Sequence, residues 1–282
     1  MSLLTRLPSS SLAHGLLTHI SDARSSISPA RALAQWHAYR AVFAAYGWTL
    51  CEVPPCEEAP DSVFVEDVLL YLPSFTDVPA ALLLTRTPTP SRAPERVGAA
   101  AFASSLAASR GLAFLEMPED AHLEGGDILK LSSSRTLYVG QTSRTSARGL
   151  AALRELAEPR GWRVLGVHID KALHLKSAMT ALPDGTILAH APLLSEEARR
   201  LPRLREVHEA EGVAVVHLNR TATATAAAGE GSRTKGALLI SAAAPRTAQM
   251  LREMGWHVEC VHIDEFEKLE GCVTCLSVRM RS

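Results

Sequence analysis

Apolar and polar residues follow a recurring pattern along this chain, in which a helical segment ends at a glycine and a short apolar run follows. The glycines in question are Gly47, Gly111, Gly161, Gly212 and Gly255. The segments 29–46, 92–110 and 144–158 are rich in alanine and long side chains, which favours helices. Glycine just past a helix is expected because that position often takes a left-handed backbone conformation. The pattern therefore predicts five helix–glycine–strand units.

A second, more polar strand candidate follows each of these units. The five segments read DSVFVEDVLLYL, HLEGGDILKL, LHLKSAMTAL, KGALLISA and CVTCLSV. A pattern with this period predicts repeated supersecondary units, although ordinary alternation of helices and strands remains an alternative. No linker rich in proline, glycine or serine divides the chain, so we expect residues 1–282 to form a single domain. The segment 221–234 is expected to be a loop within one unit.

Closure of the units on one another would bring the polar beginnings of the second strands together around a shared axis. Four units would each deliver one ionisable residue to this place: Glu66, Glu124, His174 and Cys275. The remaining unit would deliver small and hydroxyl side chains near Thr225. The repeat thus predicts a site at its centre.

Cys272 and Cys275 have a C-x-x-C spacing that is compatible with several roles. A structural zinc site needs four ligands, and the other three cysteines form no second close pair. A thioredoxin-like redox pair is expected at the start of a helix near the beginning of a small domain, whereas this pair lies in a β-rich run at the end of the chain. A buried cysteine pair and a nucleophile beside a bystander also remain open. A nucleophile would need a nearby acid or base.

Several other residues are candidates for chemistry, each with a structural alternative. His174 could be an acid/base or a core histidine, and Glu124 in HLEGGD lies where glycines allow close approach or form an ordinary turn. Glu66 and Asp67 interrupt an apolar run, with Asp61 shortly before them. Buried carboxylates are costly unless they are paired, so they form either internal salt bridges or a site for a cationic guanidinium.

Two arginines, Arg86 and Arg144, close strand-like runs, where each is either a surface residue or a partner for a carboxylate.

Composition narrows the class of protein. The chain has 282 residues, of which 47% are hydrophobic and 21% charged, and its formal net charge is −1. That charge gives no concentrated positive field for nucleic acid, and no run of residues is apolar enough for a membrane helix. Five cysteines do not suggest a disulfide framework, which favours a cytoplasmic location. We therefore expect no nucleic-acid partner and no membrane partner.

The ordered motifs closely resemble those of dimethylarginine dimethylaminohydrolase, a family of the guanidine-modifying (pentein) superfamily. They read DSVFVED, LTR, EGGD, VG-x-x-x-RT, LHLKS, PRT and LEG-x-V-T-C-L-S-V, and they cover nearly the whole chain. The resemblance implies an α/β fold, a five-bladed propeller with pseudo-five-fold repeats around a central active site. It also implies hydrolysis of asymmetric dimethylarginine and monomethylarginine to citrulline and dimethylamine or methylamine, a reaction of arginine metabolism and nitric oxide regulation. Deimination of arginine or another guanidine, or guanidine binding without catalysis, are the alternatives.

The resemblance implies catalytic roles for three residues. Cys275 would be the nucleophile that forms a covalent S-alkylthiouronium, and Cys272 occupies a position where the family often has glycine. His174 would be the general acid/base, and Glu124 would orient or stabilise it. No metal or organic cofactor is expected, and the partner would be a small-molecule substrate bound by a monomer or homodimer.

The resemblance also implies how the substrate is held. Glu66 and Asp67 would grip the guanidinium, and Asp61 would lie near the amino end of the substrate. Arg86 and Arg144 would bind the α-carboxylate, and the backbone carbonyl of Leu16 would accept a hydrogen bond from the α-amino group. The family usually carries an A-A-N-C stretch in the fourth unit, where this chain has the segment 221–231, so packing near the pocket is expected to differ there.

Overall fold

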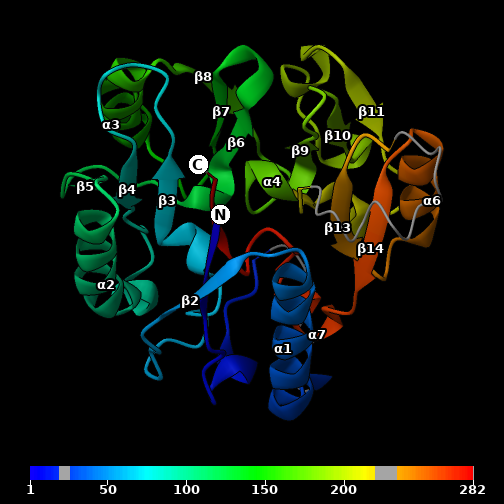
Figure 1. Cartoon of the computed structure of the whole chain (residues 1–282), viewed down its shortest axis with the longest axis horizontal. Helices are drawn as coiled ribbons and strands as arrows, with labels where there is room; N and C mark the ends of the chain where they lie inside the picture. The colour runs from blue at the N-terminus through cyan, green and yellow to red at the C-terminus, as the bar shows by residue number, and fades with distance from the viewer. Residues whose placement is uncertain (19–25, 220–233, 282) are drawn as a thin grey trace.

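Five small sheets surround a common axis, and both ends of the chain lie near that axis (Figure 1). The structure is a computed structural model and describes residues 1–18, 26–219 and 234–281. Each sheet in these ranges has three strands, in the orders β15-β1-β2, β3-β4-β5, β6-β7-β8, β9-β10-β11 and β12-β13-β14. This arrangement confirms the predicted five-bladed α/β propeller.

The strands are short, and each blade contains three of them. The first blade combines β15 from the end of the chain with β1 and β2, and each later blade contains three strands that follow one another in the sequence. The first two blades contain β15 (Val278–Met280), β1 (Ser2–Arg6) and β2 (Thr49–Val53), then β3 (Leu69–Leu72), β4 (Ala81–Leu84) and β5 (Ala113–Glu116). The next two contain β6 (Ile128–Leu131), β7 (Thr136–Gln141) and β8 (Arg163–His168), then β9 (Met179–Ala181), β10 (Ile187–Ala189) and β11 (Leu204–Glu206). The last blade contains β12 (Val215–His217), β13 (Ala237–Ser241) and β14 (His257–Val261).

Within each blade the middle strand pairs antiparallel with the inner strand and parallel with the outer strand. A parallel connection needs a crossover, and helices on the outside of the ring provide it. They are α1 (Pro29–Ala45), α2 (Glu95–Ser109), α3 (Ala147–Ala157) and α6 (Pro245–Glu253). In the fourth blade the 3₁₀ turns η8 (Ala191–Leu193) and η9 (Ala198–Arg200) take this place.

The remaining helical elements are short. Five of them are η1 (Leu12–His14), η4 (Pro90–Arg92), η6 (Ser132–Ser134), η7 (Glu158–Arg160) and α7 (Asp264–Glu267), and the others precede the inner strands. No helix in the described ranges is both long and apolar enough to cross a membrane.

The strand register repeats in all five blades at the level of single residues. The second residue of each middle strand is a fully buried leucine: Leu3, Leu82, Leu137, Leu188 and Leu238. The inner-strand residues opposite them are Arg279, Tyr71, Lys130, Thr180 and His217. All five of these opposing residues line one central cavity. The blades thus use a leucine to anchor each sheet and present a variable side chain towards the axis.

A helical turn, rather than an extended strand, precedes each inner strand. These turns are η3 (Val65–Asp67), η5 (Gly125–Asp127), α4 (Leu175–Ala178), η10 (Ala210–Val213) and the turn at 273–276. The expectation that the polar segments are strands throughout was therefore wrong for their first halves. Each turn directly precedes an inner strand, and four of the five contain or directly follow the predicted residues Glu66, Glu124, His174 and Cys275.

Four of the five predicted glycines have the left-handed backbone, with φ values of 75°, 63°, 83° and 91° at Gly47, Gly111, Gly161 and Gly255. The assignment of Gly212 to this pattern was wrong, because it lies within η10. In the fourth unit Arg203 has the positive φ, 59°, directly before β11.

In the fourth unit the predicted strands are also displaced by one strand. VAVVHL contains the inner strand β12, and KGALLISA contains the middle strand β13, so each was placed one strand out of phase. The expectation for Thr225 and the segment 221–231 lies outside the described residues.

Because the leucines anchor the blades, we expect Leu137→Ala to lower the free energy of unfolding by about 2–5 kcal/mol, the range for a buried leucine that leaves a cavity. Leu33→Ala is the control, since Leu33 lies on α1 with 39% of its surface exposed, and it should change that energy by less than about 0.5 kcal/mol. Urea unfolding followed by circular dichroism measures both. Equal effects of the two substitutions would contradict the role of the repeated leucine.

Candidate active site

Six of the predicted site residues line one small cavity at the turns that precede the inner strands. The cavity has a volume of about 20 Å³, close to the space of one water molecule. The six residues are Leu16, Asp61, Asp67, Arg144, His174 and Cys275. Asp61 and Asp67 both precede β3, whereas the other four residues come from other parts of the ring, so closure of the ring brings together residues that are far apart in the sequence.

The His174 imidazole lies among carboxylates. Its Nε2 atom is 2.7 Å from Oε2 of Glu124 and 3.8 Å from Oδ1 of Asp67. Burial alone would lower the pKa of His174, but the charges of Asp67, Asp127 and Glu124 and the hydrogen bond to Glu124 outweigh it and raise the pKa to about 9. At neutral pH the imidazole is therefore protonated and can act as an acid.

Glu124 is fully buried and is held in its charged form by its partners. Burial favours the neutral acid, yet the hydrogen bond to His174 and the positive charges of Arg92 and Arg144 lower the pKa of Glu124 well below its usual value. Thr87 also donates a hydrogen bond to Oε1 of Glu124. The carboxylate is thus fixed in charge and in orientation.

Arg92, which the sequence did not single out, connects the acidic residues of the site. Its Nη1 atom is 2.9 Å from Oδ2 of Asp67 and 3.8 Å from Oε2 of Glu124, while its other nitrogens donate two hydrogen bonds to Glu95. Arg92 is buried and lines the cavity. The only signal in the sequence was its position three residues before Glu95 at the start of a helix, which is common on protein surfaces.

The two glycines of the EGGD motif permit close packing of the turns η3 and η5. A Cβ atom on Gly125 would lie 1.9 Å from the Glu66 carbonyl oxygen. One on Gly126 would lie 2.6 Å from the His174 ring and 2.8 Å from Asp67 Oδ1. The Gly126 N–H also donates to Asp67 at 2.9 Å. These glycines therefore allow the imidazole and the Asp67 carboxylate to lie against the backbone.

Asp127, the last residue of this motif, holds the next turn in place. Its buried carboxylate accepts hydrogen bonds from Leu175 N–H, Thr142 and Thr145. Since Leu175 directly follows His174, Asp127 positions the turn that carries the imidazole.

The two cysteines lie side by side, but only Cys275 lines the cavity. Their Sγ atoms are 3.2 Å apart. The hydrogen bond from Cys275 lowers the pKa of Cys272 to about 7, whereas that same contact, burial and the nearby carboxylates Glu66 and Asp67 raise the pKa of Cys275. A cation bound in the cavity would offset those carboxylates and favour the Cys275 thiolate.

The outer helix α1 supports the turn that contains Cys275. Tyr39 on α1 donates to the Val273 carbonyl at 2.8 Å and lies 2.6 Å from the Ser277 hydroxyl. The buried phenol thus connects the outer helix of the first blade to both ends of the turn that contains Cys275.

Polar groups also line the cavity away from the sulfur. Leu16 N–H donates to both carboxylate oxygens of Asp61, at 3.1 and 3.2 Å. Arg144 lies 3.3 Å from Glu124 and donates to Thr89 at 2.9 Å and Thr18 at 3.4 Å. The cavity therefore offers Asp61 and the Leu16 backbone to an α-amino group, and the buried guanidinium of Arg144 to an α-carboxylate.

Two predicted residues have side chains directed elsewhere. Glu66 lines the separate central cavity, where its Oε1 is 2.6 Å from both Lys176 and Arg279. Arg86 pairs through its backbone with Leu123 and is not among the residues that line the small cavity. In this structure neither side chain is placed to contact a ligand there.

Asp67, Glu124 and His174 offer ligand atoms within 4.8 Å of one another and are, among the residues described, the group with the geometry to hold a metal ion. Their charges are already matched by Arg92 and by the protonated imidazole. This group includes neither cysteine, so it gives no support to a zinc site built on Cys272 and Cys275.

The fold and the site together define a class: a five-bladed α/β propeller with a cysteine, an imidazole and buried carboxylates near its axis is the arrangement of the guanidine-modifying superfamily. No family model matches the chain. However, the chain is 43% identical over 278 residues to the dimethylarginine dimethylaminohydrolase of Streptomyces coelicolor, covering 99% of this chain and 96% of that protein. It is also 26% identical over 280 residues to the enzyme of that name from Pseudomonas aeruginosa, with 98% of each covered. The chain belongs to the dimethylarginine dimethylaminohydrolase family.

Solved structures show the same fold. A dimethylarginine dimethylaminohydrolase carrying an adduct with S-methyl-L-thiocitrulline superposes with a TM-score of 0.80 at 24% identity, covering 99% of both chains. The Pseudomonas aeruginosa enzyme in complex with citrulline gives 0.77 at 25% identity, covering 99% of this chain and 98% of that one. The N-terminal domain of a cyanobacterial arginine dihydrolase gives 0.78 at 19% identity, covering 99% and 97%.

Because Glu124 supports the charged imidazole, Glu124→Gln should lower the pKa of His174 from about 9 by about one pH unit or more. The pKa falls because the negative charge of Glu124, which favours the protonated ring, has been removed. Nitrogen-detected NMR titration, with the His174 signal assigned by its loss in His174→Asn, measures this pKa. Glu155→Gln removes an exposed carboxylate and should leave it unchanged. An unaltered pKa in Glu124→Gln would contradict the arrangement.

Proposed function

We propose that this protein hydrolyses Nω-methylated arginines, asymmetric dimethylarginine and monomethylarginine, to citrulline and dimethylamine or methylamine. The observation that carries the proposal is the single cavity that contains Cys275, the protonated His174 and Asp67. The family relationship supports the same reaction. The activity is that of a C–N hydrolase acting on a linear amidine.

Asp67 is the proposed partner of the substrate guanidinium, because it is the acid of the FVED motif that lines the cavity. A planar guanidinium matches a carboxylate in a bidentate fashion. Arg92 and Gly126 hold Asp67 in place through hydrogen bonds of 2.9 Å. The cavity of about 20 Å³ is too small for an arginine side chain, so its borders must move when the substrate enters.

In the first half of the reaction the Cys275 thiolate attacks the guanidinium carbon. The substrate cation favours loss of the thiol proton to solvent, and the sulfur then forms a C–S bond as the π electrons move to nitrogen. His174, as imidazolium, protonates the departing alkylamine, and the C–N bond breaks. An S-alkylthiouronium on Cys275 and a neutral imidazole remain.

In the second half His174 takes a proton from water, and the oxygen attacks the same carbon. Collapse of this tetrahedral adduct breaks the C–S bond and loses the hydroxyl proton to solvent, which releases citrulline and returns the thiolate. Glu124 stabilises the imidazolium at the beginning and end of the cycle. Every step uses groups of this chain and water, so we propose that no metal or organic cofactor takes part.

The remaining predicted residues are proposed to hold the ends of the substrate. Asp61 and the Leu16 carbonyl would accept hydrogen bonds from the α-amino group, and Arg144 would bind the α-carboxylate. Arg86 would contribute to that carboxylate only if its side chain turned towards the cavity. We propose that Glu66 does not contact the guanidinium. It pairs instead with Lys176 and Arg279 and so stabilises the wall behind Asp67.

We further propose that residues 1–282 act as one catalytic domain, as a monomer or homodimer in the cytoplasm, without a nucleic-acid or membrane partner.

Citrulline formation from dimethylarginine, monomethylarginine and arginine, each at the same concentration, tests the substrate assignment. We expect turnover of the two methylated substrates and little turnover of arginine. A preference for arginine would instead assign the protein as a deiminase. Absence of both citrulline and a covalent adduct with any of the three would point to binding without catalysis.

Cys275→Ser should lower kcat by at least about 10³-fold while the substrate still binds, because the hydroxyl is not a nucleophile of comparable strength. Cys272→Ser is the matched control: it removes the neighbouring thiol, which does not line the cavity, and should retain most turnover. Rapid-quench mass spectrometry should detect the thiouronium adduct in Cys272→Ser and not in Cys275→Ser. The reverse result would exchange the roles of the two cysteines.

A further inference from the structure

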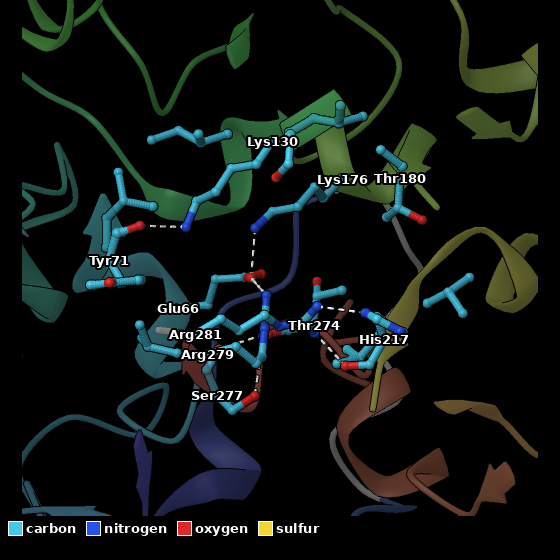
Figure 2. A pocket seen from close by; sticks show the side chains of 18 of the residues that line it. Glu66, Tyr71, Lys130, Lys176, Thr180, His217, Thr274, Ser277, Arg279 and Arg281 are labelled. Atoms are coloured by element: carbon cyan, nitrogen blue, oxygen red, sulfur yellow. Dashed lines mark hydrogen bonds and ion pairs between the residues drawn. The ribbon is translucent and has the colours of Figure 1, made fainter. Parts of the chain in front are cut away.

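A second, larger cavity lies in the centre of the ring and is separate from the catalytic pocket. Its volume is about 320 Å³, and it shares no lining residue with the small cavity. Figure 2 shows charged side chains from several blades pointing into it. The inner strands β3, β6, β9, β12 and β15 all contribute to its wall.

Positive charge dominates this cavity among the described residues that line it. Four cationic side chains face a single carboxylate, Glu66: they are Lys130, Lys176, Arg279 and Arg281. Lys176 Nζ and Arg279 Nη2 both lie 2.6 Å from Oε1 of Glu66. One carboxylate therefore contacts two of the four cations but neutralises only one positive charge.

The other two cations contact neutral groups. Lys130 donates to the Tyr71 carbonyl at 2.6 Å, and Arg281 donates to the His217 carbonyl and lies 2.7 Å from Nδ1 of its ring (Figure 2). Burial and the charge of Arg281 lower the pKa of His217 to about 4, so this imidazole is neutral and accepts the bond. With Lys130 protonated, the cavity carries an excess of three positive charges.

This excess charge is costly in a partly buried place. Burial, then repulsion from Lys176 and Arg279, lowers the pKa of Lys130 to about 7, and burial followed by Arg279 lowers that of Arg281 to about 10. Buried charges are normally paired, because an uncompensated one lacks both water and a counter-charge. A negative ligand would supply a counter-charge that the described residues of the cavity do not.

We propose that this central cavity binds a small multivalent oxyanion of the phosphate or polycarboxylate class. Guanidinium forks and ammonium groups are the partners of such oxygens in proteins, and more than one unbalanced cation favours more than one negative charge. The volume admits an ion of the size of citrate. Apolar wall residues such as Leu70, Leu129 and Val216 exclude water and strengthen the attraction.

The bound anion would lie directly behind the catalytic pocket. Glu66 and Thr274 line the central cavity, while their chain neighbours Asp67 and Cys275 line the catalytic one. The cationic wall is thus a binding site on the opposite side of the same turns, and its occupancy can be measured without turnover.

Isothermal titration calorimetry with sulfate, phosphate and citrate tests the proposal, with sodium chloride added to keep the ionic strength constant. We expect one bound anion per chain. The double variant Lys130→Met/Arg281→Gln should weaken binding by about tenfold or more for each lost charge-assisted contact. Arg110→Gln removes an exposed charge outside both cavities and should bind as the unaltered protein does. Competition between phosphate and citrate then identifies which kind of oxyanion binds more tightly.

The pH dependence gives a second measurement, for which sulfate is suitable because it stays dianionic. The groups facing Lys130 are Lys176, Arg279, Arg281, Glu66 and His217. The ordinary range of the arginines lies far above neutral pH, Glu66 has a lowered pKa, and His217 is neutral, so Lys130 is the group whose charge changes near pH 7. Sulfate should therefore bind more tightly at pH 6 than at pH 8, and Lys130→Met should remove the difference.

Three results would overturn the proposal. They are no binding of sulfate, phosphate or citrate, binding by the double variant equal to that of the unaltered protein, and, in a parallel titration with the monovalent anion acetate, binding as tight as that of sulfate. None of them depends on whether the protein turns over a guanidine, so this proposal and the proposed reaction can fail separately.

Discussion

The pairing of β15 with β1 is the constraint on which the rest of this structure depends. The inner strand of the first blade comes from the end of the chain, while the middle strand comes from its beginning. This pairing closes the ring, and it places the turn at 273–276 beside the turns of the other blades. Without it Cys275 would have no fixed position relative to His174, because two complete blades, β9–β11 and β12–β14, separate the two residues in the sequence.

Closure of the ring also determines how buried charge is arranged. The turns before the inner strands carry acids into the centre, where they would be unstable alone. Arg92 compensates Asp67 and Glu124 on one side, and Lys176 and Arg279 compensate Glu66 on the other. The centre therefore consists of two cavities of opposite character, one with a protonated imidazole among acids and one with an excess of cations.

The five blades share the residue that anchors each sheet but differ in the residue that faces the axis. The buried leucine of each middle strand is constant, since every blade needs the same anchor between its inner strand and its outer helix or turns. The residue opposite that leucine varies freely, from arginine and lysine to tyrosine, threonine and histidine. Structure is thus repeated five times while chemistry is not, which is how a symmetric ring can contain asymmetric sites.

The sequence by itself determined the five-fold repeat and the three long helices, because both follow from local periodicity and from the backbone freedom of glycine. It also indicated which residues gather at the axis, since they occupy similar positions in successive units. It misplaced the fourth unit, where Arg203 has the left-handed conformation that glycine has in the others. Only the tertiary structure decided that Asp67 and Cys275 face one cavity while Glu66 and Thr274 face the other. It also decided that Arg92 is a buried partner and not a surface residue. The reason is that neighbouring residues of a tight turn point in different directions, and the packing of turns from distant parts of the chain selects which cavity each side chain reaches.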